Sequence, residues 1–286
     1  MWIIFAFGSA LFAGITAILA KIGIKNTDSH VATAFRTIII LVFSWLMVFI
    51  VGSQNTIFDI SNKTLVFLIL SGMATGGSWL CYFKALQLGD VNKVSPIDKS
   101  STVLSMILAF IILGESITVI KLIAMIVIGV GTYFMIARKN TEVINLTGNS
   151  WIVYAIFSAV FASLTSILGK IGIQGVESNL GTAIRTIVVL VMAWIVVFAA
   201  GKQKEVTKID KRSMIFICFS GITTGLSWLC YYKALQEGQA SIVVPIDKLS
   251  ILVTIAFSSL ILKEKLTRKS VFGLVILVFG TLLLLI

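Results

Sequence analysis

The sequence contains two closely similar stretches in which charged side chains stand beside apolar runs. Residues 76–99 and 225–248 align without a gap at an offset of 149, are identical at 16 of 24 positions, and both end in Pro-Ile-Asp-Lys. Charges so close to the start of an apolar span are costly unless paired, so they are the first candidates for function. The charged candidates occur in matching sets, which are Lys21, Arg36, Lys84, Asp98 and Lys99 in the first half and Lys170, Arg185, Lys233, Asp247 and Lys248 in the second.

The spacing of these charges predicts ion pairs across two turns. Lys84 and Asp98 are equally distant from residue 91, so we expect them at similar depth on adjacent antiparallel helices, as we do Lys233 and Asp247. One interpretation is a pair of symmetry-related gates in which each aspartate changes its protonation or its ion-pair partner. Another is direct contact with substrate, in which the lysines and arginines neutralise an anionic group.

A structural interpretation of the same charges stays open. Lys21 and Arg36 could extend their charged ends toward lipid headgroups, and the Lys–Asp pairs could simply hold hairpins together. Asp98 follows Pro96 near the start of a helix, where the helix dipole favours an acid and a capping box is expected. The second copy weakens this capping argument, because Val244 precedes its proline and supplies no hydroxyl.

The helix before each Pro-Ile-Asp-Lys motif carries hydroxyl and aromatic side chains at helical spacing. Such a face suits the wall of a central cavity, which needs apolar surface with a few polar groups. The alternative is a packing face, since Gly72 and Gly76 form a GxxxG pattern on a neighbouring stripe. The predicted substrate-cavity residues are Thr75, Ser78, Trp79 and Tyr82 with their copies Thr224, Ser227, Trp228 and Tyr231.

Composition identifies an integral membrane protein. Of 286 residues, 58% are hydrophobic and 12% charged, and the mean hydropathy is +1.06. A soluble domain does not need so much apolar surface. The net charge of +11 lies mostly between apolar spans, so it sets orientation and does not indicate nucleic-acid binding. The three cysteines are interpreted as packing residues, and no nucleophile, metal or cofactor motif is present. We therefore expect no enzyme, no metal and no cofactor.

Ten apolar stretches predict an all-α fold with ten transmembrane helices. In the first half they run roughly over 2–22, 31–51, 64–87, 92–113 and 118–137, and in the second half over 151–171, 180–200, 213–236, 241–262 and 269–286. Each is long enough to cross a hydrocarbon core of about 30 Å. Two repeats of five helices, an odd number, must enter the membrane in opposite directions, which predicts inverted repeats. The expected domains are 1–139 and 151–286, joined by a linker at 140–150.

Loop charges predict the orientation in the cell membrane. After the eight matched basic residues at helix ends are set aside, 13 of the remaining lysines and arginines fall on one side and two, Lys63 and Lys121, on the other. The positive-inside rule places the larger group in the cytoplasm. Both termini are then expected outside the cytoplasm.

At this point the chain resembles the drug/metabolite transporter superfamily in its ten-helix, EamA-like form. The resemblance rests on the doubled five-helix unit, the SWLCYxKALQ helix, the PIDK motif, and the LGES and LKEK segments at Glu115 and Glu264, which we interpret as loop or interface residues. It implies a secondary transporter, most often an exporter of amino acids or similar small metabolites. Members are usually drawn with both termini in the cytoplasm, which opposes the charge count.

The resemblance leaves several features of the transporter open. The expected partners are a small-molecule substrate and the lipid bilayer, with proton coupling as one option and a monomer or homodimer as the assembly. A lipid or lipid-linked sugar translocase is an alternative that the same superfamily permits. A membrane scaffold without transport is a second alternative, although doubled intramembrane charges in inverted repeats are hard to justify without access from two sides.

Overall fold

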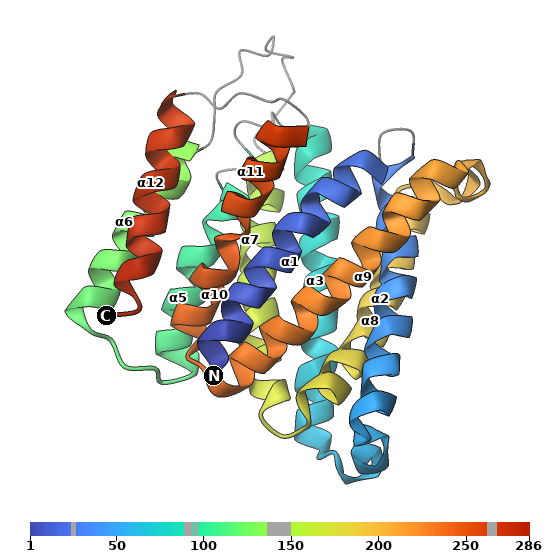
Figure 1. The fold of residues 1–286 in the computed structure, drawn as a ribbon, viewed down its shortest axis with the longest axis horizontal. Helices are drawn as coiled ribbons and strands as arrows, with labels where there is room; N and C mark the ends of the chain where they lie inside the picture. The colour runs from blue at the N-terminus through green and yellow to red at the C-terminus, as the bar shows by residue number, and fades with distance from the viewer. Residues whose placement is uncertain (24–26, 89–93, 95–96, 136–149, 262–267) are drawn as a thin grey trace.

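The computed structural model describes residues 1–23, 27–88, 94, 97–135, 150–261 and 268–286. The described residues form an all-α bundle (Figure 1). The first half contains α1 (Trp2–Gly23), α2 (Ser29–Val51), the 3-10 helix η1 (Ser53–Asp59), α3 (Asn62–Leu88), α5 (Ser101–Ile112) and α6 (Val119–Met135). The second half contains α7 (Ser150–Ile173), α8 (Ser178–Ala199), η2 (Gln203–Lys208), α9 (Lys211–Glu237), α10 (Ala240–Lys248), α11 (Ser250–Ile261) and α12 (Arg268–Leu283).

The outer surface of the bundle is apolar, as the sequence predicts for a membrane protein. Within the described residues, seven segments are long and apolar enough to cross a membrane. Large apolar side chains point outward on them and on the shorter helices; on α12, Phe272, Val275 and Phe279 form an exposed stripe at helical spacing. Lipid is the solvent that makes such a surface stable.

The two halves of the chain run in opposite directions. The helices α1 and α9 are antiparallel, because a Cβ built on Gly23 near the end of α1 would meet Ile217, near the start of α9, while Gly238 lies against Trp2. The helices α3 and α7 pack in the same antiparallel way, and Figure 1 shows that α1 and α7, which open the two halves, have opposite directions. This arrangement agrees with the inverted repeats expected from the sequence.

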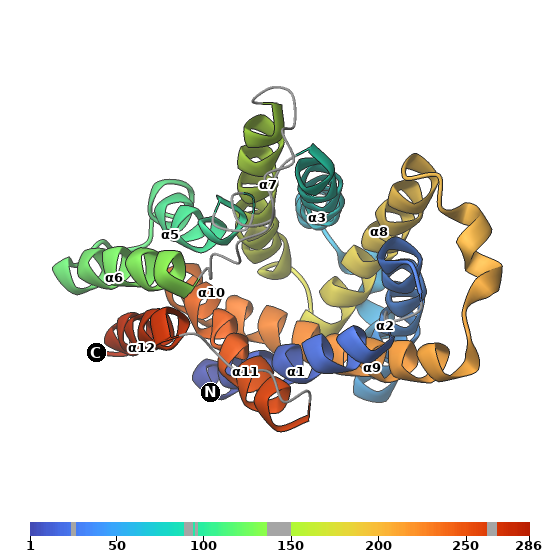
Figure 2. The ribbon, with the colours of Figure 1, turned by 90° about the horizontal axis from the view of Figure 1, so that it is seen from above.

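The main helix contacts join one repeat to the other. The helix α3 packs on α7 and α1 on α9, while the equivalent helices α2 and α8 pack together, as do α6 and α12 (Figure 2). Glycines permit the close approach of α3 and α8, because a Cβ added at Gly72 would come within 2.7 Å of Val188 and one at Gly76 within 2.4 Å of Met192. The GxxxG stripe therefore packs against a helix, and the hydroxyl stripe beside it is left for another surface.

Each repeat breaks a helix directly after its Pro-Ile-Asp-Lys motif. The sequence predicts single helices over 92–113 and 241–262, but the structure interrupts the helical path at Ser100 and at its repeat equivalent Leu249. At both positions the backbone N–H bonds three residues back, to Ile97 at 3.2 Å and to Ile246 at 2.9 Å. The helix of each motif therefore ends in a tighter turn of the 3-10 type.

The two termini lie at the same end of the bundle, which we call the terminal end (Figure 1). Trp2 and Ile3 line one pocket together with Leu283–Ile286, so the chain begins and ends close together. An even number of membrane crossings is consistent with this arrangement. The linker expected at 140–150, apart from Ser150 itself, lies outside the described residues, as do Pro96 and Glu264.

Candidate functional site

A central cavity of 370 Å³ lies between the two repeats and draws its wall from both. Helices α1, α2 and α3 contribute from the first repeat, and α7, α8, α9 and α10 from the second. Its size falls within the range of small-molecule sites in proteins. The wall includes most of the predicted cavity residues, namely Thr75, Ser78, Trp79, Thr224, Ser227, Trp228 and Tyr231.

Tyr82 is placed elsewhere. It packs beside a buried cluster of Ala85, Val94 and Ala155, away from the cavity, whereas its repeat equivalent Tyr231 lies in the cavity wall. The Tyr231 hydroxyl donates a hydrogen bond of 2.8 Å to Ser166. The repeat equivalent of Ser166 is Ala17, which has no hydroxyl to accept such a bond. The two tyrosines therefore occupy different surroundings although their sequence contexts match.

Four of the predicted charged residues line the central cavity. They are Arg36, Arg185, Asp247 and Lys248, which combine residues of both predicted clusters in one place. Lys248 lies 3.8 Å from Asp247. The two arginines come from the equivalent helices α2 and α8 but belong to one shared wall, so the charges do not form two separate clusters on opposite faces.

The remaining predicted charges lie outside the cavity wall. Lys84 is exposed and lines a separate pocket with His30 and Tyr154, and Lys99 is exposed. The helix α1 contains Lys21, whose side chain is outside the described part of the structure. Lys233 pairs with Glu237 one turn along its own helix, at 3.0 Å.

The expected Lys–Asp pairs across the turns are wrong. Among the described ion pairs, Lys233 bonds Glu237 and Asp247 bonds Lys248, and Lys84 does not pair with Asp98. A partner four residues along the same helix is already held close, whereas a partner across a turn depends on the loop geometry. The hypothesis that these pairs open and close as gates therefore loses its geometric basis.

Each aspartate is instead held by a serine of the other repeat. Asp98 accepts a hydrogen bond of 3.0 Å from Ser158 on α7, and Asp247 accepts one of 2.6 Å from Ser9 on α1. Ser9 and Ser158 are separated by 149 residues, so they are repeat equivalents. The chain of bonds continues to α9, because Ser227 donates to the carbonyl oxygen of Ser9 at 3.1 Å.

The matching chain joins α3 to α7. Ser78 donates to the carbonyl oxygen of Ser158 at 3.1 Å, so it repeats the Ser227–Ser9 bond at the equivalent position. The bonds from Ser158 to Asp98 and from Ser9 to Asp247 have a carboxylate as the acceptor. Charge-assisted bonds of that type are stronger than neutral ones and fix the position of the carboxylate. The signal for these serines in the sequence is their occurrence at the same place in both repeats, which reasoning from local spacing misses.

Arg185 is the most deeply buried charge in the site, with 2% of its surface exposed. Its Nε donates to the Ser71 hydroxyl at 3.0 Å, and its Nη2 donates to the Thr75 hydroxyl. Its guanidinium carbon lies 5.1 Å from the ring centre of Trp228 and 4.9 Å from that of Tyr232. Cation–π contacts and two hydrogen bonds therefore hold the plane of the guanidinium in place.

The two arginines are not bonded alike. The repeat equivalents of Ser71 and Thr75 are Ser220 and Thr224, but Ser220 donates to the carbonyl of its own helix at Ile217, 2.8 Å away. Thr224 likewise donates to the Ser220 carbonyl at 2.6 Å. Thr75 makes the same bond within its helix and still accepts from Arg185, so such a bond does not exclude an arginine. Among the described contacts, Arg36 has no hydrogen bond to Ser220 or Thr224.

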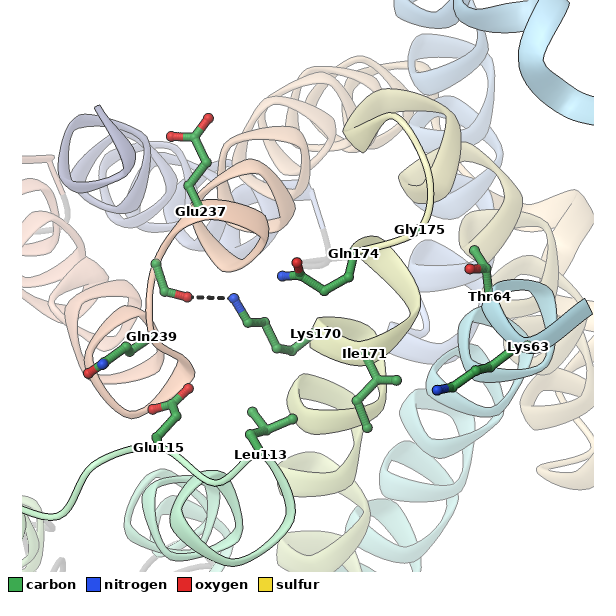
Figure 3. Close-up of a pocket in the computed structure, with 11 residues that line it drawn as sticks. Lys63, Thr64, Leu113, Glu115, Lys170, Ile171, Gln174, Gly175, Glu237 and Gln239 are labelled. Carbon is green, nitrogen blue, oxygen red and sulfur yellow. Dashed lines mark hydrogen bonds between the residues drawn. The ribbon is translucent and has the colours of Figure 1, made fainter. Parts of the chain in front are cut away.

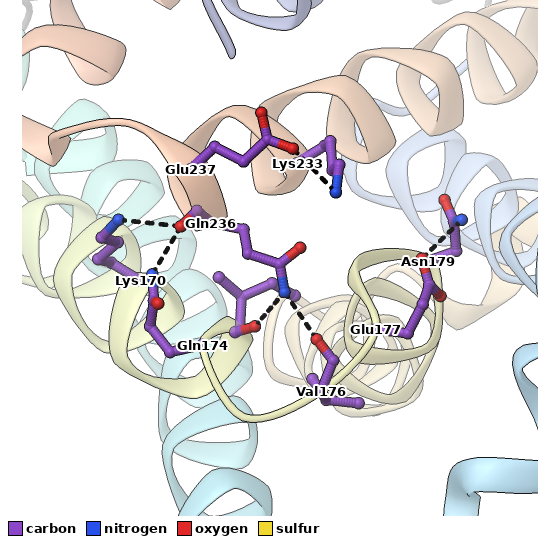
Figure 4. Close-up of polar contacts among 9 residues, drawn as sticks. Lys170, Gln174, Val176, Glu177, Asn179, Lys233, Gln236 and Glu237 are labelled. Atoms are coloured by element: carbon purple, nitrogen blue, oxygen red, sulfur yellow. Dashed lines mark hydrogen bonds and ion pairs between the residues drawn. The ribbon is translucent and has the colours of Figure 1, made fainter. Parts of the chain in front are cut away.

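A layer of polar contacts closes the bundle at the terminal end. The ammonium of Lys170 donates to the carbonyl of Gly238 at 2.7 Å (Figure 3). It also donates to the carbonyl of Leu235, so it caps the last turn of α9. The Gln236 side-chain amide donates to the carbonyls of Ile173 and Val176, both at 2.8 Å (Figure 4). These bonds fasten the end of α9 to the end of α7.

Glu115 extends this layer to α10. Its two carboxylate oxygens accept from the backbone N–H groups of Ala240 and Ser241, at 2.6 and 3.0 Å. An acid at this position satisfies donors that a helix N-terminus leaves free and complements its dipole. The contact joins the loop after α5 to the second repeat, which agrees with the interface role expected for Glu115.

This layer separates the central cavity from a second pocket of 590 Å³ at the terminal end. Lys63, Glu115 and Lys170 line the second pocket (Figure 3). One turn of α7 divides Lys170 from Ser166, which lines the central cavity, and Ile167 between them is fully buried. The two pockets are therefore lined by adjacent turns of α7.

Similarity to known proteins identifies the family. The model of the EamA-like transporter family matches residues 1–137 and again residues 149–286. The chain belongs to the EamA-like transporter family. It is thus a multi-pass membrane protein of a transporter family and not of an enzyme family, with two EamA domains over its length. In the described part of the chain, no group of three or more His, Cys, Asp or Glu residues could hold a metal ion.

Relatives of this EamA-like chain include proteins the length of one repeat. A protein of Sinorhizobium sp., described as an uncharacterized transporter in the cobO 3′ region, is 40% identical over 135 residues, which are 47% of this chain and 96% of that protein. An uncharacterized transporter of Archaeoglobus fulgidus is 23% identical over 286 residues, covering 99% of this chain and 98% of its own. A solved crystal structure matches with a TM-score of 0.76 at 14% identity, covering 98% of this chain and 95% of that one, which shows a shared fold.

Proposed function

We propose that the protein is a secondary active transporter that moves small polar metabolites, such as amino acids, by alternating access through ten membrane crossings. In this proposal α10 and α11 together make one crossing, and α5 with the residues before it makes the equivalent crossing of the first repeat. The proposed direction, export, follows the family resemblance. The proposed orientation, with both termini outside the cytoplasm, follows the loop charges.

One observation carries the proposal. The central cavity is built from matching residues of two inverted repeats, such as Trp79 and Trp228, and hydrogen bonds of Lys170 and Glu115 join the helix ends at the terminal end. In transporters built this way, substrate sites lie at the repeat interface, near broken helices, and access alternates by rocking one unit against the other. The breaks at Ser100 and Leu249, next to Asp98 and Asp247, fit that arrangement.

The unequal bonding of the repeats supports a two-state mechanism. Arg185 is docked on Ser71 and Thr75, while the equivalent contacts of Arg36 are absent from the described bonds. A protein whose repeats exchange roles would form the second set of contacts when its other end closes. The structure would then represent the state that is closed at the terminal end.

Counterflow in proteoliposomes tests the proposed function. A thermal-shift screen of metabolites on the purified protein first selects a solute, and vesicles loaded with unlabelled solute are then diluted into labelled solute. A carrier should accumulate label transiently, and Trp228→Ala should reduce the rate because Trp228 lines the cavity. Phe58→Ala is the control, since Phe58 is 96% exposed in η1.

Other outcomes would assign a different function. Movement of fluorescent lipid between leaflets without solute counterflow would favour a lipid translocase. No movement of either, with folded protein in the vesicles, would favour a membrane scaffold. Either result would overturn the proposal of a metabolite carrier.

A further inference from the structure

Arg185 has a hydrogen-bond donor that nothing in the described structure satisfies. Its Nε and Nη2 bond Ser71 and Thr75, but its Nη1 is buried and has no partner among the described residues. A guanidinium is charged at every accessible pH, so this donor cannot escape its cost by losing a proton. A buried unsatisfied donor on a charged group is destabilising, and proteins keep such groups where function requires them.

The second arginine of the cavity wall is in a similar position. The Nε of Arg36 is buried and also lacks a partner among the described residues. Both arginines line the same 370 Å³ cavity. Two incompletely bonded guanidinium groups from equivalent helices of the two repeats therefore belong to one space.

The charges of the cavity wall do not balance. Arg36, Arg185 and Lys248 contribute three positive charges, and Asp247 is the only acid among the described residues that line it. Asp247 is already engaged by Lys248 at 3.8 Å and by the Ser9 hydroxyl at 2.6 Å. Since Lys248 pairs with Asp247, the two arginines are left without an acid among the described residues of the wall. Uncompensated charge inside a membrane protein is costly.

We propose that the central cavity recognises the oxyanion group, carboxylate or phosphate, of a small organic anion, with Arg185 as the main binding residue and Arg36 as the second. This inference deepens the proposed function and rests on the same cavity. Arg185 is suited to the role because Ser71, Thr75 and the rings of Trp228 and Tyr232 fix its plane before the ligand arrives. A preorganised guanidinium binds an oxyanion through parallel N–H donors and spends little entropy in doing so.

The rest of the wall suits the organic part of the ligand. Trp79 and Trp228 supply flat apolar surface from the two repeats, and the hydroxyls of Ser78 and Ser227 are already engaged in the bonds to Ser158 and Ser9. The cavity therefore offers charge at the arginines and apolar surface beside it. A neutral compound of the same shape would leave the two arginine donors unsatisfied.

Matched pairs of probes test this inference by calorimetry on the purified full-length protein in nanodiscs. Benzoate is compared with benzamide, which is neutral and nearly the same shape, and phenylphosphonate with benzenesulfonamide, which is neutral and also tetrahedral at the polar group. We expect both anions to bind and both neutral probes to bind at least about tenfold more weakly, because a charge-assisted bond is lost. Equal binding within each pair, or no binding by either anion, would overturn the inference.

Variants locate the site. Arg185→Gln should weaken anion binding by about tenfold or more, while Arg185→Lys should restore part of it because the charge is kept without the planar fork. Arg212→Gln, at the exposed start of α9, is the control and should leave binding unchanged. If Arg185→Gln fails to fold, the site is located with the double variant Trp228→Phe, Arg36→Gln and with the probe pairs on the unmodified protein. Anion binding that the double variant leaves unchanged would overturn the assignment of the site to the central cavity.

The source of the oxyanion and the proposed function are tested separately. Benzoate binding is compared between nanodiscs with only neutral headgroups and nanodiscs that contain phosphatidylglycerol. If phosphatidylglycerol weakens benzoate binding, the oxyanion is that of a lipid headgroup. If it does not, the oxyanion belongs to a soluble anion. Binding without counterflow would contradict the transporter proposal and leave the anion site standing. Counterflow of a neutral solute without anion binding would support the transporter proposal and overturn the anion site.

Discussion

Replacing Glu115 by Gln should loosen the start of α10. The carboxylate accepts two backbone hydrogen bonds there, from Ala240 and Ser241, and glutamine keeps one acceptor oxygen but loses the charge. Losing a side-chain cap costs about 0.5–2 kcal/mol, and losing an acid at a helix N-terminus costs a further ~0.3–1 kcal/mol. The combined loss, about 1–3 kcal/mol, corresponds to a roughly 5- to 150-fold change in a local opening equilibrium.

Amide hydrogen exchange followed by mass spectrometry measures this opening directly. The backbone N–H groups of Ala240 and Ser241 should exchange faster by that factor in Glu115→Gln, while exchange in α8 stays unchanged, because local opening governs protection. Glu205→Gln is the control, since the Glu205 carboxylate, among its described contacts, is bonded to Lys208 alone, in an exposed i,i+3 pair. A change below twofold, or one equal to that of the control, would refute the role of Glu115 in closing the terminal end.

Three further predictions concern packing, the aspartates and orientation. Gly131→Ala should lower the thermal unfolding temperature, with a loss of about 1–3 kcal/mol, because its Cβ would lie 2.5 Å from the backbone of α12, whereas Gly129→Ala, whose Cβ has 3.5 Å of room, should be near neutral. Asp98→Asn and Asp247→Asn should shift cysteine accessibility in opposite directions, since each carboxylate holds a serine of the other repeat; shifts in the same direction would contradict this. A cysteine at Lys204 should not react with an impermeant reagent in intact cells, and labelling there would reverse the proposed orientation.

Much of the fold follows from the sequence because the repeat is written twice. The offset of 149 and the hydrophobic spans predict the helices α1, α2, α3, α7, α8 and α9 to within about three residues. An odd number of spans in each repeat predicts the inversion. The breaks at Ser100 and Leu249 were not predicted, although Pro245 is a signal for a distorted helix.

The hydroxyl and aromatic stripe also follows from local spacing, since one helix face carries it. The partners of the charges do not, because they come from distant parts of the chain. Asp247 bonds Ser9, 238 residues away, and no local pattern joins the two. The predicted partner of Lys233 was wrong because Glu237 stands one turn along the same helix, a competitor visible in the sequence.

The central claim is that the central cavity faces each side of the membrane in turn. A cysteine at Thr165, which lines the cavity from α7, reports this in a protein whose native cysteines, Cys81, Cys218 and Cys230, are replaced by alanine. Impermeant reagent is added to oriented vesicles from the outside or the inside alone. The account predicts that reagent added on either side reaches the cysteine, and that full reaction from one side leaves nothing to react from the other. Reaction from one side only, whichever bound solute is present, would contradict it.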